Sequence, residues 1–282
     1  MREFTAPAII KPGRRIAAVS DIDSLYLQTA VRAARRAGAL HLKYQGGDLG
    51  IETKSSEADL VTIVDREAEL AIRAEILADF PDHAILGEEG GAAGAGAAEA
   101  LWVVDPLDGT VNYAHGFPFY CVSIALDLNG RTVVGAVLDP VHDELFTATL
   151  GGGAFLNGEH IHVSKVELLS PRAMLATGFP YDVQGALASL RVFQRFLLRN
   201  IPVRRPGAAA LDLCSVACGR FDGFWEGKLN AWDCAAGNLI VQEAGGIVSN
   251  VSGNAFRYED RPLVASNGLI HQDILDVLNA EE

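Results

Sequence analysis

The segment that decides the fold of this chain is residues 101–110, LWVVDPLDGT. Its first four residues are apolar and predict a strand, and Asp105 and Asp108 follow at the carboxyl end, where open α/β sheets place their ligands. Pro106 fixes one backbone dihedral and Gly109 frees another, so a tight turn can direct both carboxylates toward one point. Asp, Pro and Gly are also common in ordinary turns, and this segment alone fits either interpretation equally well.

Other acidic residues favour a metal site over a plain turn. Glu88 and Glu89 follow the apolar run 84–86, at another predicted strand end. Adjacent carboxylates repel each other, and either a cation or solvent relieves that repulsion. Asp233 opens a predicted helix, where an acid can also serve as a cap or first-turn residue.

A site made from these acids would offer oxygen ligands only. Such ligands suit Mg²⁺ or Mn²⁺ rather than zinc. The backbone N–H groups of Gly109 and Thr110 are available to meet an anion. Two or more ions at such a site could activate a water and neutralise a phosphate.

Composition narrows the protein class. Among the 282 residues, 49% are hydrophobic and 21% charged, enough apolar material for a large core, and the net charge of −13 makes direct nucleic-acid binding unexpected. No run of apolar residues predicts a membrane span, and the first residues do not resemble a signal peptide, so we expect a cytoplasmic protein. The seven histidines form no ligand pattern, and the four cysteines are expected to be reduced core thiols.

Periodicity predicts an α+β first half. Apolar residues at three- and four-residue steps predict helices over 24–44 and 66–78. β-rich runs predict strands over 101–105, 119–128 and 132–138, with a hairpin turn at Asn129-Gly130. The Gly- and Ala-rich residues 90–100 are expected to form a mobile surface loop.

The second half alternates helices with short strands, which is typical of a layered α/β unit. Helices are predicted over 186–199, 209–218 and 233–244, and strands over 173–177, 223–225, 247–250 and 263–265. We therefore expect a loose arm over residues 1–23, an α+β metal-binding half over 24–160 and an α/β half over 161–282.

Three segments together resemble the inositol monophosphatase family. They are Glu88-Glu89, residues 102–113 (WVVDPLDGTVNY), and residues 232–237 (WDCAAG) with 243–246 (EAGG). The resemblance runs from about residue 24 to the C-terminus. It implies a five-layer αβαβα sandwich of the inositol monophosphatase / fructose-1,6-bisphosphatase type, commonly a homodimer. Such enzymes hydrolyse phosphate monoesters with Mg²⁺ and are often inhibited by Li⁺.

The resemblance also implies roles for the acidic residues. One ion would be held by Glu88, Asp105 and the backbone carbonyl of Leu107. A second would be held by Asp105, Asp108 and Asp233, and a third, weaker ion would lie near Glu88, so that two or three Mg²⁺ ions are expected. Glu89 is an additional candidate.

The catalytic roles are implied in the same way. Asp65 matches the acid that pairs with a threonine hydroxyl, here Thr110, to orient and deprotonate the attacking water. Phosphate would lie against the amides of Gly109 and Thr110. Lys54 matches a lysine on a loop near the metals, although an ordinary exposed loop lysine fits equally well.

Substrate contacts are implied for Asp108, Ala209 and Glu226. Asn230 stands where inositol-specific animal members often carry His, so the resemblance is closer to bacterial members with broad preferences. We expect hydrolysis of inositol 1-phosphate with tolerance for other phosphorylated polyols or sugars. Alternatives are fructose-1,6-bisphosphatase, histidinol-phosphatase or 3′-phosphonucleotide phosphatase activity, or a regulatory role in transcription or RNA processing.

Overall fold

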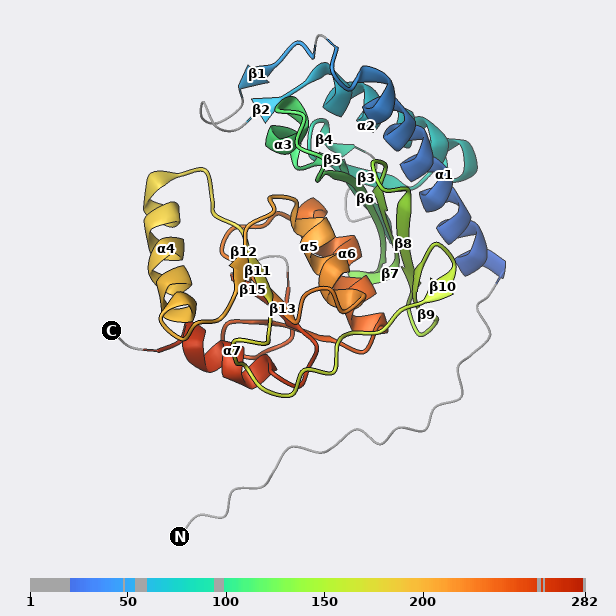
Figure 1. The fold of residues 1–282 in the computed structure, drawn as a ribbon. Coiled ribbons are helices and arrows are strands. Elements are labelled where there is room, and N and C mark those ends of the chain that lie inside the picture. Colours follow the sequence, from blue (N-terminus) through green and yellow to red (C-terminus); the bar gives the residue numbers. More distant parts are fainter. Residues whose placement is uncertain are drawn as a thin grey trace.

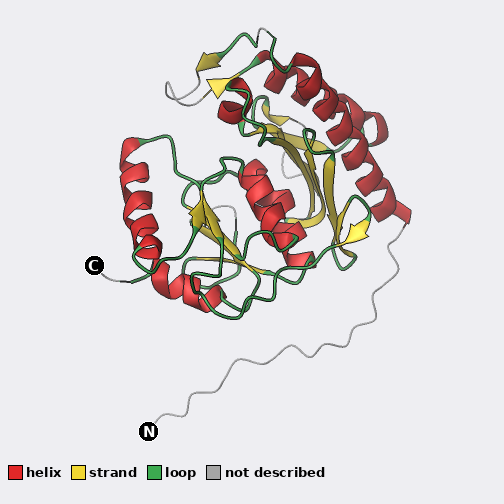
Figure 2. Cartoon of the chain, viewed as in Figure 1, coloured by secondary structure: helices red, strands yellow, loops and turns green. Residues whose placement is uncertain are grey.

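The computed structural model describes residues 21–47, 49–53, 60–93, 99–257, 260 and 262–280. Its helices and strands stack in five alternating layers, which is the αβαβα sandwich that the sequence resemblance implied (Figure 1). The three helical layers are α1 (Asp21–Tyr44) with α2 (Ile63–Asp79), α5 (Ala209–Ala217) with α6 (Ala231–Glu243), and α4 (Val183–Leu197) with α7 (His271–Leu278). Figure 2 shows the two groups of strands separated by helices.

The first sheet has eight strands in the order β10-β9-β8-β7-β6-β5-β3-β4. Their bounds are β3 Ala84–Gly87, β4 Gly91–Ala93, β5 Ala100–Asp108, β6 Cys121–Leu128, β7 Arg131–Asp139, β8 Glu144–Thr149, β9 Gly153–Leu156 and β10 Glu159–His160. Only β3 and β5 pair in parallel. The predicted hairpin turn joins β6 to β7, with Asn129 and Gly130 both at positive φ, as its tight turn requires.

The second sheet has five strands in the order β12-β11-β13-β15-β14. Their bounds are β11 Leu175–Thr177, β12 Val203–Arg204, β13 Gly223–Glu226, β14 Ile247–Asn250 and β15 Leu263–Ser266. Two further strands, β1 (Glu52–Thr53) and β2 (Leu60–Val61), form a separate antiparallel pair beside α3 (Thr110–Ala114). The strands and helices predicted in the second half are therefore present, with ends shifted by a few residues.

The apolar run at 101–104 is explained by helices on both faces of the first sheet. Trp102 and Val104 pack in the core beneath α1 and α2, whereas Val103 packs in the core beneath α5 and α6. Side chains alternate between the two faces of a strand, so both sets must be apolar when both faces are covered. This double burial anchors β5 between two apolar cores.

Two predictions about the first half were wrong: the start of the first helix and the absence of a strand from the loop 90–100. Helix α1 begins at Asp21, so residues 21–23 belong to the helix and not to the predicted arm, whose other residues lie outside the described part. Within the predicted loop 90–100, residues Gly91–Ala93 form the edge strand β4, paired with β3. Backbone pairing needs no side chain, which is why a Gly/Ala composition did not reveal it. Residues 94–98 lie outside the described part.

Across the described ranges, no helix combines the length and apolar character that crossing a membrane would require.

Candidate functional site

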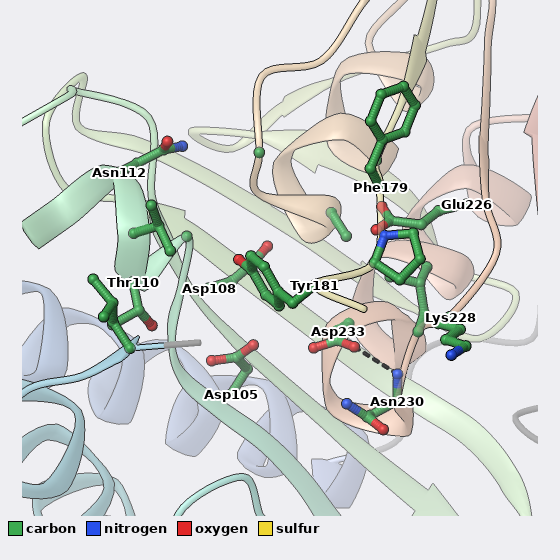
Figure 3. Close-up of a pocket in the computed structure, with 18 of the residues that line it drawn as sticks. Asp105, Asp108, Thr110, Asn112, Phe179, Tyr181, Glu226, Lys228, Asn230 and Asp233 are labelled. Carbon is green, nitrogen blue, oxygen red and sulfur yellow. Dashed lines mark hydrogen bonds between the residues drawn. The ribbon is translucent and has the colours of Figure 1, made fainter. Parts of the chain in front are cut away.

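Most of the predicted site residues line a cleft of about 830 Å³, to which both halves of the chain contribute. The first half contributes Glu88, Asp105, Leu107, Asp108, Gly109 and Thr110, and the second half contributes Ala209, Glu226, Asn230 and Asp233. Figure 3 shows Asp105, Asp108 and Asp233 around the middle of the pocket, with Glu226 beyond Asp233, near Phe179. The tertiary fold thus joins residues that are more than a hundred positions apart.

The end of β5 is irregular, and this irregularity presents its two aspartates. The pairing of β5 with β6 shifts register between Asp105 and Asp108. The Asp105 carboxylate accepts a hydrogen bond from the Leu107 amide at 3.0 Å, and Asp108 accepts one from the Ala210 amide of α5 at 2.7 Å. Gly109 follows at φ 91°, and a Cβ there would lie 3.0 Å from the Phe119 carbonyl oxygen. Only glycine fits this turn without strain.

Asp65 and Thr110 are in direct contact. Asp65 lies in the first turn of α2, where its Oδ2 accepts hydrogen bonds from the amide and the hydroxyl of Thr62, both at 2.7 Å. Its Oδ1 is 3.0 Å from the Thr110 hydroxyl, which is also 3.0 Å from the Leu107 carbonyl oxygen. A hydroxyl has one proton to donate, so these two acceptors compete for it. Asp65 itself is fully buried behind Thr110.

Asp233 lies in the first turn of α6, as the sequence predicted. Its Oδ2 accepts a hydrogen bond from the Asn230 amide at 2.5 Å (Figure 3). This contact uses the backbone of Asn230, and the residue is the N-cap of α6. The side chain of Asn230 remains exposed at the rim of the cleft.

The carboxylates raise one another's pKa values. Burial is the main cause of the raised pKa of Asp105, and the neighbouring charges of Glu88, Asp108 and Asp233 add to it. Burial raises the pKa of Asp108 to about 7, with Glu88 opposing its ionisation further. Burial and then Glu88 and Asp108 raise the pKa of Asp233. Such a cluster ionises fully only when a cation compensates it.

Bound Mg²⁺ fits this donor set. Across the described ranges, no three acidic, imidazole or thiol side chains already lie in an arrangement that could hold a metal ion by themselves. Mg²⁺ does not require one, because it commonly takes one or two carboxylates and keeps waters or substrate phosphate as its other ligands. A divalent cation would relieve the mutual repulsion of Asp105, Asp108 and Asp233.

Glu226 stands apart from this cluster, at the end of β13. Burial raises its pKa to about 8, with a further contribution from Asp108, while Arg205 lowers it. Arg205 lines the same cleft and lies over the Phe179 ring, 6.0 Å from its centroid. The far wall of the cleft therefore offers a carboxyl group, a guanidinium and an aromatic ring.

Sequence reasoning missed two residues behind the site. His41, which was expected to contribute nothing, is fully buried and hydrogen-bonds the Pro106 carbonyl oxygen at 2.9 Å. Glu69 is also buried, and it accepts hydrogen bonds from the amides of Glu89 and Gly90. The spacing of Asp65 and Glu69, one helical turn apart, was the available signal for Glu69. His41 had none, because its contact depends on the packing of α1.

Two other candidates are not placed in the cleft. Glu89 contributes its backbone amide to Glu69 and does not line the cleft. Lys54 lies outside the described residues.

The sequence profile of the inositol monophosphatase family matches residues 23–281. The chain belongs to the inositol monophosphatase family. The chain is 46% identical to the Nus factor SuhB of Pseudomonas aeruginosa over 86% of this chain and 91% of that protein. It is 42% identical to the inositol-1-monophosphatase of Synechocystis sp., over 93% of this chain and 91% of that protein. It also shares 43% identity with phosphatase IMPL1, chloroplastic, of Arabidopsis thaliana over 78% of this chain, spanning 61% of that protein's length.

Solved structures of family members share the fold. The extragenic suppressor protein SuhB of Bartonella henselae superimposes with a TM-score of 0.87 at 37% identity, covering 92% of this chain and 100% of that one. An IMPase/NADP phosphatase complexed with Mg²⁺ and phosphate gives a TM-score of 0.78 at 27% identity, over 94% of this chain and 97% of that one. These findings support a phosphatase of the inositol monophosphatase type.

Proposed function

We propose that this chain hydrolyses small phosphate monoesters with Mg²⁺, inositol 1-phosphate foremost, by direct attack of water. The observation that supports this proposal is that the acidic cluster of Asp105, Asp108 and Asp233 lines one cleft with Thr110, whose hydroxyl is hydrogen-bonded to the buried Asp65 behind it. The acidic cluster suits cations, and the hydrogen-bonded pair suits proton removal.

The acidic cluster would hold two or three Mg²⁺ ions, with Mn²⁺ as an alternative. Glu88, Asp105 and the Leu107 carbonyl would hold one, and Asp105, Asp108 and Asp233 another. When bound, such ions lower the pKa of water and neutralise phosphate charge. Hydrogen bonds fix Asp105 and Asp108 to the Leu107 and Ala210 amides, so these carboxylates keep their orientation before any ion binds.

The Asp65–Thr110 pair would orient the attacking water and receive its proton. The Thr110 hydroxyl can accept a hydrogen bond from water while it donates its own proton to Asp65. Burial raises the pKa of Asp65, which makes it a better proton acceptor, although hydrogen bonds from Thr62 and Thr110 limit that rise. α3 begins at Thr110, so the amides of Gly109 and Thr110 lack intrahelical acceptors and can meet the phosphate.

The far wall of the cleft would bind the leaving alcohol. Glu226 can hydrogen-bond hydroxyls of a polyol, together with Asp108 and the backbone at Ala209. Asn230 replaces the histidine of inositol-specific members at the exposed rim, which favours broad acceptance of phosphorylated polyols and sugars. Fructose 1,6-bisphosphate, histidinol phosphate and 3′-phosphonucleotides are the alternative substrates.

A phosphate-release panel tests this proposal. The purified protein is assayed with inositol 1-phosphate, fructose 1,6-bisphosphate, histidinol phosphate and 3′-phosphoadenosine 5′-phosphate, each with and without Mg²⁺. We expect Mg²⁺-dependent turnover, highest on inositol 1-phosphate. Absence of turnover on all four, with metal binding demonstrated separately, would refute the proposal. Adding Li⁺ to the same assay tests the proposed Li⁺ sensitivity.

We further propose that the protein acts in the cytoplasm as a homodimer. Helix α4 supports an interface between copies, because Val183, Leu187, Leu190 and Leu197 leave large apolar surfaces exposed along it. Exposed apolar surface of this extent is typical of protein contacts. Sedimentation of the wild type and of Leu187→Lys tests this interface. We expect a dimeric wild type and a monomeric variant, and a monomeric wild type would contradict the proposal.

A regulatory role in transcription or RNA processing is the second candidate. The observation that favours it is that a 46% identical relative is a Nus factor. The proposal is tested by affinity capture of RNA polymerase with the wild type and with Asp108→Asn. Capture by both proteins would support a role independent of hydrolysis, and capture by neither would exclude it.

A further inference from the structure

Helix α2 carries three charged residues on one face, each one turn beyond the last: Asp65, Glu69 and Arg73. Residues four apart share a helix face, so these three side chains form one stripe along α2. Asp65 contacts Thr110, as described above. Glu69 and Arg73 contact the turn between β3 and β4, which carries Glu88. One helix face therefore touches two separate parts of the proposed site.

Glu69 is surrounded by donors. Its Oε2 accepts the Glu89 amide at 2.8 Å, and its Oε1 accepts the Gly90 amide at 3.0 Å and the Arg73 Nε at 2.8 Å. Arg73 also donates to the Gly91 carbonyl oxygen at 3.0 Å. With 3% of its surface exposed, Glu69 makes these contacts away from bulk water, where charge-assisted hydrogen bonds are strongest.

The turn is closed tightly around this carboxylate. A Cβ at Gly87 or at Gly90 would lie 2.5 Å from an atom of the Glu69 carboxyl group, well inside van der Waals contact. Glycine at both ends of the turn is what lets its backbone reach Glu69. Glu88 lies between these glycines and lines the cleft, and its amide bonds the Val104 carbonyl oxygen of β5 at 3.2 Å.

We propose that Glu69, with Arg73, is a positioning residue that holds the β3–β4 turn so that the Glu88 carboxylate faces the metal-binding cleft. The inference rests on the proposed function, because it assigns Glu88 to a metal. Glu69 itself does not line the cleft. Its carboxylate is required because two oxygens accept three N–H donors, whereas an amide would offer one oxygen and turn an NH₂ group toward a donor.

The test is Mn²⁺ binding to the metal-free protein, followed by electron paramagnetic resonance, with Mg²⁺ activation measured in parallel. Glu69→Gln should weaken Mn²⁺ binding by about 10-fold or more, as is typical when a ligand's hydrogen-bonded support is lost. The Mg²⁺ concentration for half-maximal activity should rise in proportion, while kcat at saturating Mg²⁺ changes little. Glu69→Ala should show a larger loss than Glu69→Gln.

Glu75→Gln is the matched control. Glu75 is on the same helix and is also ion-paired, to Arg32 and Arg36 of α1, and it does not line the cleft. It should lose its ion pairs without any change in Mn²⁺ affinity. Equal Mn²⁺ affinity in Glu69→Gln, Glu75→Gln and the wild type would overturn the inference.

A second variant covers the case in which Glu69→Gln does not fold. Gly90→Ala leaves Glu69 in place and displaces the turn from it, so it should weaken Mn²⁺ binding as well. A folded Gly90→Ala protein with wild-type affinity would overturn the inference. Failure of the proposed function has a different signature, because the wild type itself would then bind no Mn²⁺ and release no phosphate.

Discussion

Asp65 and Asp233 occupy the same local position in two different helices, but their surroundings suit them to different roles. Each lies three residues beyond an N-cap, at α2 and at α6, and each accepts a hydrogen bond from the amide of its cap residue. Both satisfy a free amide at a helix start and suit the positive end of the helix dipole. Local sequence alone would make them equivalent.

Their surroundings differ. The remaining oxygen of Asp65 meets the Thr110 hydroxyl, and hydrogen bonds from Thr62 and Thr110 oppose the rise in its pKa that burial and, least of all, the Glu89 charge cause. Asp233 has more like charge around it, since Glu88, Asp108 and Glu226 all raise its pKa beyond the effect of burial, and only the Asn230 amide opposes that rise. A first-turn acid surrounded by donors suits proton transfer, and one surrounded by carboxylates suits a cation.

The largest expected effect comes from Asp233→Asn. If Asp233 holds Mg²⁺ as proposed, its loss should reduce phosphate release by about 10³-fold or more, because metal assistance contributes several kcal/mol. The asparagine oxygen can still accept the Asn230 amide, so the helix start should persist. Steady-state kinetics with Mn²⁺ titration check this, and activity within tenfold of the wild type would contradict the assignment.

Asp65→Asn should have the next largest effect. Removing the proton acceptor should lower kcat by about 10²-fold, in the usual range for general-base catalysis. Metal affinity should stay unchanged, unlike that of Asp233→Asn. If Mn²⁺ binding falls equally in both variants, the two aspartates do not have separate roles.

The stability of the metal-free protein should depend on pH. Asp108 has a folded-state pKa of about 7, raised from 3.8. Its contribution to the free energy of unfolding is therefore fully present below pH 3.8, the pKa of the unfolded chain, and is lost as the pH rises through 7. Between about pH 4 and 7, in a chelator, the unfolding temperature should fall by several degrees, with little further change from Asp108 above about pH 8. Mg²⁺ should restore it. Asp108→Asn should flatten the profile, and an unchanged slope in that variant would contradict the cause.

The smallest effect is expected for Thr110→Ser. The serine hydroxyl can make the same contact with Asp65, so kcat should remain within about tenfold of the wild type. Thr110→Val, which matches threonine in shape and lacks the hydroxyl, should lose about as much as Asp65→Asn. The ratio of kcat between the two variants measures how much the hydroxyl contributes to catalysis. Similar kcat values in both would remove Thr110 from the proton path.

Much of the site could be predicted from sequence because its parts are local signals. The apolar run 101–104 predicted a buried strand, and Asp105, Asp108 and Gly109 followed it in a turn whose residue types are restrictive. The first-turn position of Asp233 was evident from the helix that follows it. Their metal and catalytic roles stay predictions until the variants above are measured, as does the division of the chain near residue 160.

Sequence by itself determined which residues bend, cap and extend the chain, because those properties depend on neighbours within a few positions. Only the tertiary structure decided that the acids of β5 and α6 line one cleft, and that Asp65, Glu69 and His41 lie behind it. Such contacts depend on which distant backbone packs against which face. A buried carboxylate or imidazole looks like any other polar residue in sequence until its hydrogen-bond partners are known.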